Sequence, residues 1–224
     1  MPSRKIVVFD AYGTVFDVAG AVRHASAEAG PLVADWAALA ATWRRKQLEY
    51  SWLHTLLGAH ADFAEVTAEA LDWTFEALGL NDRALRGRLL ALYDRLPSFP
   101  EVAHALATLK DRGFRLALLS NGTPAMLQSA LAANALQDRF DAVISVEEAG
   151  VYKPSPQVYA LVEQRMAVTR DKVLFVSSNG WDVAGAARFG FATVWVNRDA
   201  APMDRLPHGP NHIIPDLARL SVIA

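Results

Sequence analysis

The chain has 224 residues, 52% of them hydrophobic and 21% charged, and it carries a formal net charge of −2. A chain of this length and hydrophobicity can bury a large core, which argues against a disordered protein. Its 24 acidic and 22 basic residues form no long run of one sign, so we expect neither nucleic acid nor a membrane surface as a partner. The absence of cysteine excludes disulfides, thiolate metal sites and a cysteine nucleophile.

The first predicted element is a strand at residues 6–9. Its short, unbroken run of β-branched and aromatic side chains is typical of a strand buried in a parallel sheet. Asp10 follows it directly, so the apolar run is too short for the core of a signal peptide, and no other stretch is long enough to cross a bilayer. We therefore expect a soluble, cytoplasmic protein.

Residues 15–96 have a different character, with alanine, leucine, tryptophan and charged residues at helical spacing and no convincing strand. We predict that this stretch is an all-helical cap domain inserted after the first strand. A long helix is predicted to begin near Asp35, a residue type favoured at the N-cap. One apolar stripe of this helix, expected to face the core of the insert, contains Trp36, Leu39, Trp43, Tyr50, Leu53 and Leu57.

Segments 1–14 and 97–224 are predicted to form a Rossmann-like catalytic core. A proline-rich segment at residues 96–100 leads from the insert back to this core. After it, apolar runs predict further strands at 114–119, 142–146, 172–177 and 192–196. Segments with helical periodicity separate the strands, and this alternation predicts an α/β fold with a doubly wound parallel sheet. We expect residues 198–212, which contain three prolines, to be a loop, and the six histidines show no metal-binding spacing.

Polar residues follow four of the predicted strands, at the edge where open α/β sheets place their sites. In chain order these groups are Asp10 to Thr14, Ser120 to Gly122, Lys153 with Pro154, and Ser177 to Asp182. A single carboxylate at a strand end often does no more than cap the next helix. Four such groups at one edge of a sheet favour a catalytic site.

The order of these groups resembles the four motifs of the haloacid dehalogenase superfamily, and the resemblance spans essentially the whole chain, including a cap after the first motif. Phosphatases of this superfamily have a second acid two residues after the nucleophile Asp10, whereas this chain has Tyr12. The fourth motif offers one carboxylate, Asp182, after the serines and asparagine of residues 177–179. Because Mg²⁺ prefers several charged oxygen ligands, this set predicts a site without a metal ion or other cofactor.

Three segments, residues 10–14, 43–50 and 177–182, resemble the L-2-haloacid dehalogenases more specifically. The resemblance implies a hydrolase that converts a short-chain (S)-2-haloacid to the (R)-2-hydroxyacid and a halide, and it implies a homodimer. The alternatives are a Mg²⁺-dependent phosphatase of the same superfamily and a non-catalytic relative. A non-catalytic relative is disfavoured because the charged residues Asp10, Lys153 and Asp182 are all present.

The resemblance also implies catalytic roles. Asp10 is the nucleophile that displaces the halide from C2 of the substrate and forms an aspartyl ester. Lys153 is the cation expected to keep Asp10 ionised, and Asp182 can pair with it. Asp182 and Asn179 are the candidates to place and polarise the water that cleaves the ester, and which of them takes the proton stays open. The residues expected to hold or support the nucleophile are Thr14, Ser120, Lys153, Tyr159 and Ser177.

Arg44 matches the cap arginine that assists the departing halide, and a guanidinium beside an apolar cleft stabilises an anion as it forms. Arg45 and Lys46 fit solvated positions, because residues one and two apart on a helix do not share a face. Leu48 lies one turn after Arg44 and is expected to line the same pocket. The other residues that match substrate-binding positions are Ala11, Tyr12, Phe63, Asn121 and Trp181.

Overall fold

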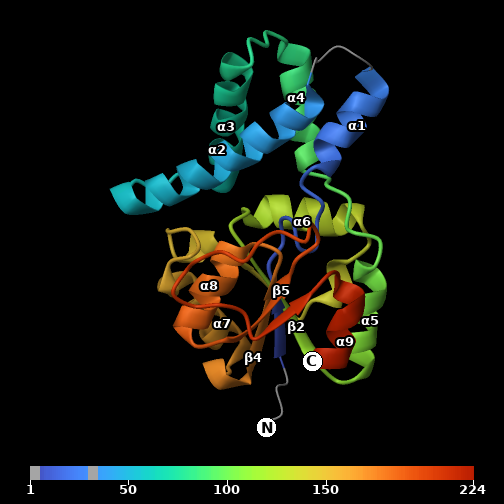
Figure 1. Cartoon of the computed structure of the whole chain (residues 1–224), viewed down its shortest axis with the longest axis vertical. Coiled ribbons are helices and arrows are strands. Elements are labelled where there is room, and N and C mark those ends of the chain that lie inside the picture. Colours follow the sequence, from blue (N-terminus) through green and yellow to red (C-terminus); the bar gives the residue numbers. More distant parts are fainter. Residues whose placement is uncertain (1–5, 30–34) are drawn as a thin grey trace.

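The computed structural model describes residues 6–29 and 35–224, and a six-stranded sheet forms its centre (Figure 1). The strands are β1 (Ile6–Phe9), β2 (Arg115–Ser120), β3 (Ala142–Ser145), β4 (Val173–Ser177), β5 (Ala192–Val196) and β6 (His212–Ile214). All neighbouring strands are parallel, and their order is β3-β2-β1-β4-β5-β6. β1 therefore lies inside the sheet, between β2 and β4.

Helices cover both faces of this sheet. They are α5 (Val102–Asp111), α6 (Pro124–Ala133), α7 (Pro156–Met166), α8 (Gly180–Phe189) and the short α9 (Leu220–Ile223). Figure 1 shows α5 and α9 on one side of the sheet and α7 and α8 on the other. Every residue of β1 and β4 is buried, which explains why these strands are continuous apolar runs. The predicted doubly wound α/β fold is confirmed.

Four helices follow β1 and lie beyond the carboxyl ends of the strands (Figure 1). They are α1 (Gly20–Ala29), α2 (Trp36–Leu57), α3 (Phe63–Ala77) and α4 (Arg83–Tyr93). Asp35 is the N-cap of α2, as predicted, because its side chain accepts a hydrogen bond of 2.8 Å from the amide of Ala38. Gly58 ends the helix in the left-handed conformation with φ of 64°, which glycine adopts without strain.

The buried face of α2 differs from the predicted apolar stripe. Leu39 and Trp43 are buried as predicted, but the polar Gln47 is buried as well. Leu53 and Leu57 are instead 43% and 76% exposed. The reason is the length of α2, because its last turns extend past the neighbouring helices, as Figure 1 shows.

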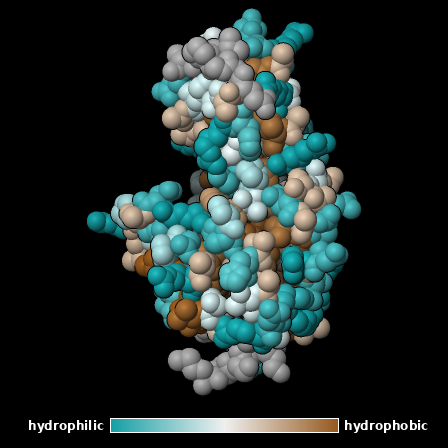
Figure 2. Space-filling view, turned by 90° about the vertical axis from the view of Figure 1, so that its right-hand side faces the viewer, coloured by the Kyte–Doolittle hydropathy of each residue, from teal (hydrophilic) through white to brown (hydrophobic). Residues whose placement is uncertain are grey.

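The prediction of a loop over residues 198–212 is wrong at its end, because His212 begins the edge strand β6, which pairs with β5. Two of the three residues of β6 are exposed, so the strand has no apolar run that would reveal it. The face of the molecule in Figure 2 is mostly hydrophilic, with small separate hydrophobic patches. Within residues 6–29 and 35–224, no helix has the length and apolar character needed to cross a membrane.

Candidate active site

Asp10 stands at the centre of the sheet's carboxyl edge. It follows β1 directly, and its amide donates a 2.9 Å hydrogen bond to the carbonyl of Val176 in the neighbouring strand β4. The chain leaves β2 and β4, on either side of β1, toward opposite ends of the sheet, so a crevice opens at this point. The side chain of Asp10 is buried at this point of the sheet edge.

Four side chains hold the carboxylate of Asp10. Its Oδ2 accepts hydrogen bonds from Thr14 Oγ1 at 2.9 Å, Asn179 Nδ2 at 2.8 Å and Ser177 Oγ at 3.3 Å. Its Oδ1 accepts one from Lys153 Nζ at 3.0 Å. Because three of the four donors bind Oδ2, the carboxylate is held in one orientation and Oδ1 keeps a lone pair for attack on an electrophile.

Lys153 joins the two buried carboxylates of the site. Its ammonium lies 3.0 Å from Asp10 Oδ1 and 2.8 Å from Asp182 Oδ2, and the lysine side chain is 1% exposed. Burial alone lowers the pKa of Lys153, but the two carboxylates outweigh it and raise that pKa above its ordinary value. The lysine is therefore charged and places a positive charge beside the carboxylate of Asp10.

Asp182 is fully buried and bonded at both oxygens. Tyr159 Oη donates to its Oδ1 at 2.7 Å, and Lys153 donates to its Oδ2. Burial raises the pKa of Asp182 to about 6, with Asp10 adding to the rise and Lys153 opposing it. Burial and the charge of Asp182 raise the pKa of Tyr159, so the tyrosine stays protonated as a donor. A carboxylate with this pKa accepts protons near neutral pH.

Arg44 brings a second cation to the site from α2. Its Nη2 lies 3.4 Å from the carbonyl oxygen of Tyr12 and 3.5 Å from Asn179 Oδ1, and its Nη1 donates to Gln47 Oε1 at 2.8 Å. Its neighbour Arg45 lies elsewhere, with a side chain that is 61% exposed and is 3.8 Å from a glutamate on the same helix. The structure thus places Arg44 at the site and Arg45 on the surface.

Aromatic rings border the crevice beside Asp10. The ring of Tyr12 lies 5.6 Å from Phe63 and is stacked on Tyr93 at 5.5 Å. Tyr12 and Phe63 are buried, whereas Trp181 is half-buried and meets Trp52 of α2 edge to face at 5.4 Å. Burial raises the pKa of Tyr12, so this side chain stays neutral.

The other residues singled out from the sequence lie nearby with different contacts. The hydroxyl of Ser120, at the end of β2, accepts a 3.0 Å hydrogen bond from the amide of Gly122. The amide oxygen of Asn121 accepts from the backbone amide of Lys153 at 3.2 Å. Ala11 is fully buried next to Asp10, and Leu48 is half-buried on α2.

The donor set of the crevice does not fit Mg²⁺. The described residues contain no group of three or more histidine, cysteine, aspartate or glutamate side chains that could hold a metal ion. The two acids of the site, Asp10 and Asp182, are both bonded to the ammonium of Lys153, and the carbonyl of Tyr12 faces Arg44 and Asn179. A divalent cation here would meet two positive side chains and too few charged oxygens.

Two residues near Arg44 were missed by the sequence reasoning. Gln47 and Tyr93 are buried, and each has a polar atom bonded in the same small network as Arg44. Gln47 could have been found, because it is three residues after Arg44 and therefore on the same helix face. Tyr93, at the end of α4, carries no such local signal.

The chain belongs to the haloacid dehalogenase-like hydrolases, whose family model matches residues 4–190. It is 44% identical to (S)-2-haloacid dehalogenase 1 of Pseudomonas sp. (strain CBS-3) over 95% of this chain and 93% of that protein. It is 49% identical to the (S)-2-haloacid dehalogenase of Xanthobacter autotrophicus over 87% of this chain and 75% of that protein. The resemblance predicted from the motifs is confirmed.

A solved structure extends the comparison to chemistry. The L-2-haloacid dehalogenase from Xanthobacter autotrophicus with chloropropionic acid covalently bound matches this fold with a TM-score of 0.88 at 40% identity. The match covers 98% of this chain and 97% of that one. A relative of the same fold thus forms a covalent bond with a haloacid.

Proposed function

We propose that the protein is a metal-independent (S)-2-haloacid dehalogenase, which hydrolyses a short-chain (S)-2-haloacid to the (R)-2-hydroxyacid and a halide through an aspartyl ester on Asp10. The observation that carries this proposal is the buried carboxylate of Asp10, which is oriented by four donors, one of them the cation Lys153, with Arg44 lying next to the donor Asn179. The covalent haloacid in a relative supports it independently.

In the first step, Oδ1 of Asp10 attacks C2 of the substrate on the side opposite the halogen. A carbon–oxygen bond forms, the carbon–halogen bond breaks with its electron pair going to the halide, and C2 is inverted. Arg44 stabilises the halide as its charge develops. Because aspartate is a weak nucleophile in water, alignment in a dry crevice supplies much of the acceleration, which for well-oriented groups is roughly 7 to 11 kcal/mol.

In the second step, water attacks the carbonyl carbon of the Asp10 ester. We assign Asp182 as the acceptor of the water proton, because its pKa of about 6 suits the task at neutral pH. Lys153 stabilises the negative charge that develops on the ester oxygen, and Asn179 positions the water. The bond between the carbonyl carbon and Oδ1 then breaks, the departing alkoxide takes up the proton that Asp182 accepted, and the hydroxyacid leaves with an oxygen that came from Asp10.

The same proposal divides the chain into a cap of residues 15–96 and a catalytic core of residues 1–14 and 97–224. The two connections between them lie side by side, because Phe16 forms an antiparallel bridge with Ser98. In this division, the cap contributes Arg44 to a site whose other charged residues, Asp10, Lys153 and Asp182, belong to the core. Substrate contacts are proposed for Ala11, Tyr12, Leu48, Phe63, Asn121 and Trp181.

We also propose a homodimer. The exposed end of α2 supports it, because Leu56 and Leu57 are 81% and 76% exposed there. The cytoplasmic location stays a prediction from the sequence.

Halide release from (S)-2-chloropropionate is expected to survive excess EDTA and to gain nothing from added Mg²⁺. The reason is the donor set, in which Tyr12 and Asn179 stand where a phosphatase of this superfamily would need acids. The measurement is initial halide release with and without chelator, beside hydrolysis of a phosphate ester. Loss with EDTA and recovery with Mg²⁺, or faster turnover of the ester, would replace the dehalogenase with the phosphatase alternative.

Arg44→Lys is expected to lower kcat at least about tenfold with little change in thermal stability, whereas Arg45→Lys leaves both nearly unchanged. A planar guanidinium and a point charge stabilise a departing anion differently, and Arg45 lies on the surface. Steady-state halide release and melting temperature measure the two effects. Equal losses of kcat in both variants would refute the assignment of Arg44 to the halide.

A further inference from the structure

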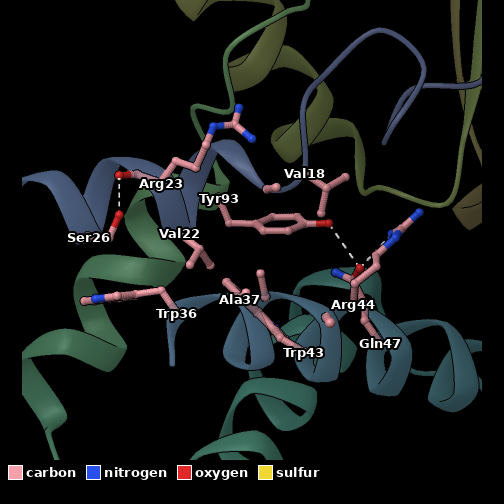
Figure 3. Close-up of a pocket in the computed structure, with 13 residues that line it drawn as sticks. Val18, Val22, Arg23, Ser26, Trp36, Ala37, Trp43, Arg44, Gln47 and Tyr93 are labelled. Atoms are coloured by element: carbon pink, nitrogen blue, oxygen red, sulfur yellow. Dashed lines mark hydrogen bonds between the residues drawn. The ribbon is translucent and has the colours of Figure 1, made fainter. Parts of the chain in front are cut away.

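Arg44 lies between two hollows. One is a largely apolar groove of about 630 Å³ formed by α1, α2 and the end of α4, lined by residues such as Val22, Ala40 and Trp43 (Figure 3). The other, of about 420 Å³, lies toward Asn179 and is more polar. Because open space borders the guanidinium in two directions, packing alone does not fix its position, and hydrogen bonds must do so.

The shortest hydrogen bond of Arg44 goes to Gln47. Arg44 Nη1 donates to Gln47 Oε1 at 2.8 Å, compared with 3.4 and 3.5 Å for its contacts with Tyr12 and Asn179. The same oxygen of Gln47 accepts from Tyr93 Oη at 3.1 Å. Figure 3 shows Gln47 between Arg44 and Tyr93 at one end of the groove. Gln47 is 1% exposed, so water does not compete for these bonds.

The orientation of the Gln47 amide is determined by its second partner. Gln47 Nε2 donates to Thr67 Oγ1 at 2.7 Å, and Thr67 Oγ1 donates its own proton to the carbonyl of Phe63 at 2.5 Å. Since that proton is already used, Thr67 can only accept from Gln47. The amide nitrogen must therefore face Thr67, and the oxygen must face Arg44.

We propose that Gln47 is the positioning residue that holds Arg44 where it receives the departing halide. This inference rests on the proposed dehalogenase function. A neutral amide suits the task, because it fixes the guanidinium without cancelling its positive charge. A carboxylate at this position would hold Arg44 equally well but would compete with the halide for its charge.

A role in halide departure has a measurable signature. Chloride is a poorer leaving group than bromide, so breaking the carbon–chlorine bond depends more on a well-placed cation. Loosening Arg44 should therefore slow a chloro acid more than a bromo acid, whereas a general loss of structure slows both equally.

The test compares Gln47→Met, which keeps the length of the side chain and removes its hydrogen bonds, with the wild type. Halide release is measured in single turnovers with enzyme in excess, on (S)-2-chloropropionate and (S)-2-bromopropionate. We expect a loss of about tenfold or more on the chloro acid and a severalfold rise in the bromo-to-chloro rate ratio. Ser51→Ala, another buried polar position on α2 with no contact to Arg44, should leave the ratio unchanged.

The outcomes distinguish a failure of the positioning role of Gln47 from a failure of the proposed dehalogenase function. If the wild type releases halide and Gln47→Met slows both substrates by the same factor, the positioning role is refuted and the dehalogenase function stands. If the wild type releases no halide from either acid, the proposed function itself fails. Gln47→Glu should also be slow and favour the bromo acid, and wild-type rates in this variant would overturn the argument for a neutral amide.

Discussion

With enzyme in excess over substrate in ¹⁸O-water, the first turnover is expected to place ¹⁸O in the peptide that contains Asp10 and to leave the hydroxyacid nearly unlabelled. The hydroxyl oxygen of the product comes from Asp10, because Oδ1 attacks C2 and water then attacks the ester carbonyl. Direct attack of water on C2 would give the same product with the same inversion, so only the position of the label distinguishes the routes. Mass spectrometry of the peptide and of the product measures it.

A variant pair provides the control for the labelling experiment. Asp10→Asn should lose on the order of 10⁴-fold or more in kcat and incorporate no label in the first turnover. Asp171→Asn, which changes a carboxylate at the surface of the protein, should behave as the wild type. Label found mainly in the hydroxyacid of the wild type would refute the covalent route and reduce Asp10 to a general base.

Asp182→Asn is expected to release about one halide per active site and then to slow by about 10²- to 10⁴-fold, because the ester forms but is not hydrolysed. Asp10 remains bonded to Lys153, Thr14 and Asn179, so attack on C2 retains its oriented carboxylate. Rapid-quench halide measurement shows the burst. The mass of the Asp10 peptide should rise by the mass of the bound 1-carboxyalkyl group, which replaces a proton of the carboxyl group.

The result that contradicts this role is a first turnover slowed as much as the steady state. Asp182 would then act on the attack step, by holding Lys153 in place rather than by accepting a proton. Tyr159→Phe removes one hydrogen bond from the side-chain carboxylate of Asp182 while keeping its charge, and it should slow hydrolysis of the ester far less than Asp182→Asn.

The parts of the fold that were predicted are those in which local sequence and burial agree. β1 is buried on both faces, so its apolar run predicts it directly, and the start of α2 follows from the N-cap Asp35. The predicted apolar stripe of α2 is wrong at its C-terminal end, because burial there depends on where the neighbouring helices end. β6 was not predicted, because it is short, lies at the edge of the sheet and has exposed residues.

The site was predicted through the order of its motifs, since parallel strands bring their carboxyl ends to one edge. This places Asp10, Lys153 and Asp182 together without any knowledge of distances. The sequence could not predict that the Ser120 hydroxyl bonds to the amide of Gly122, because one rotation of a side chain decides it. The sequence also could not predict that Tyr93 lies at the site, because its contact with Gln47 joins α4 to α2, which are far apart in the sequence.

The central place of β1 in the sheet bears on how the chain gains activity as it is synthesised. Ile6 pairs with Arg115 on one side and with Val173 on the other, and Ser177, which bonds to Asp10, is 167 residues away from it. The nucleophile is thus among the first residues made and among the last to be put in place, because such distant pairings close late. A nascent chain that ends before β4 carries Asp10, Thr14, Lys153 and Arg44 but lacks Ser177 and Asn179, two of the four donors to the carboxylate, so activity requires the chain to extend past β4.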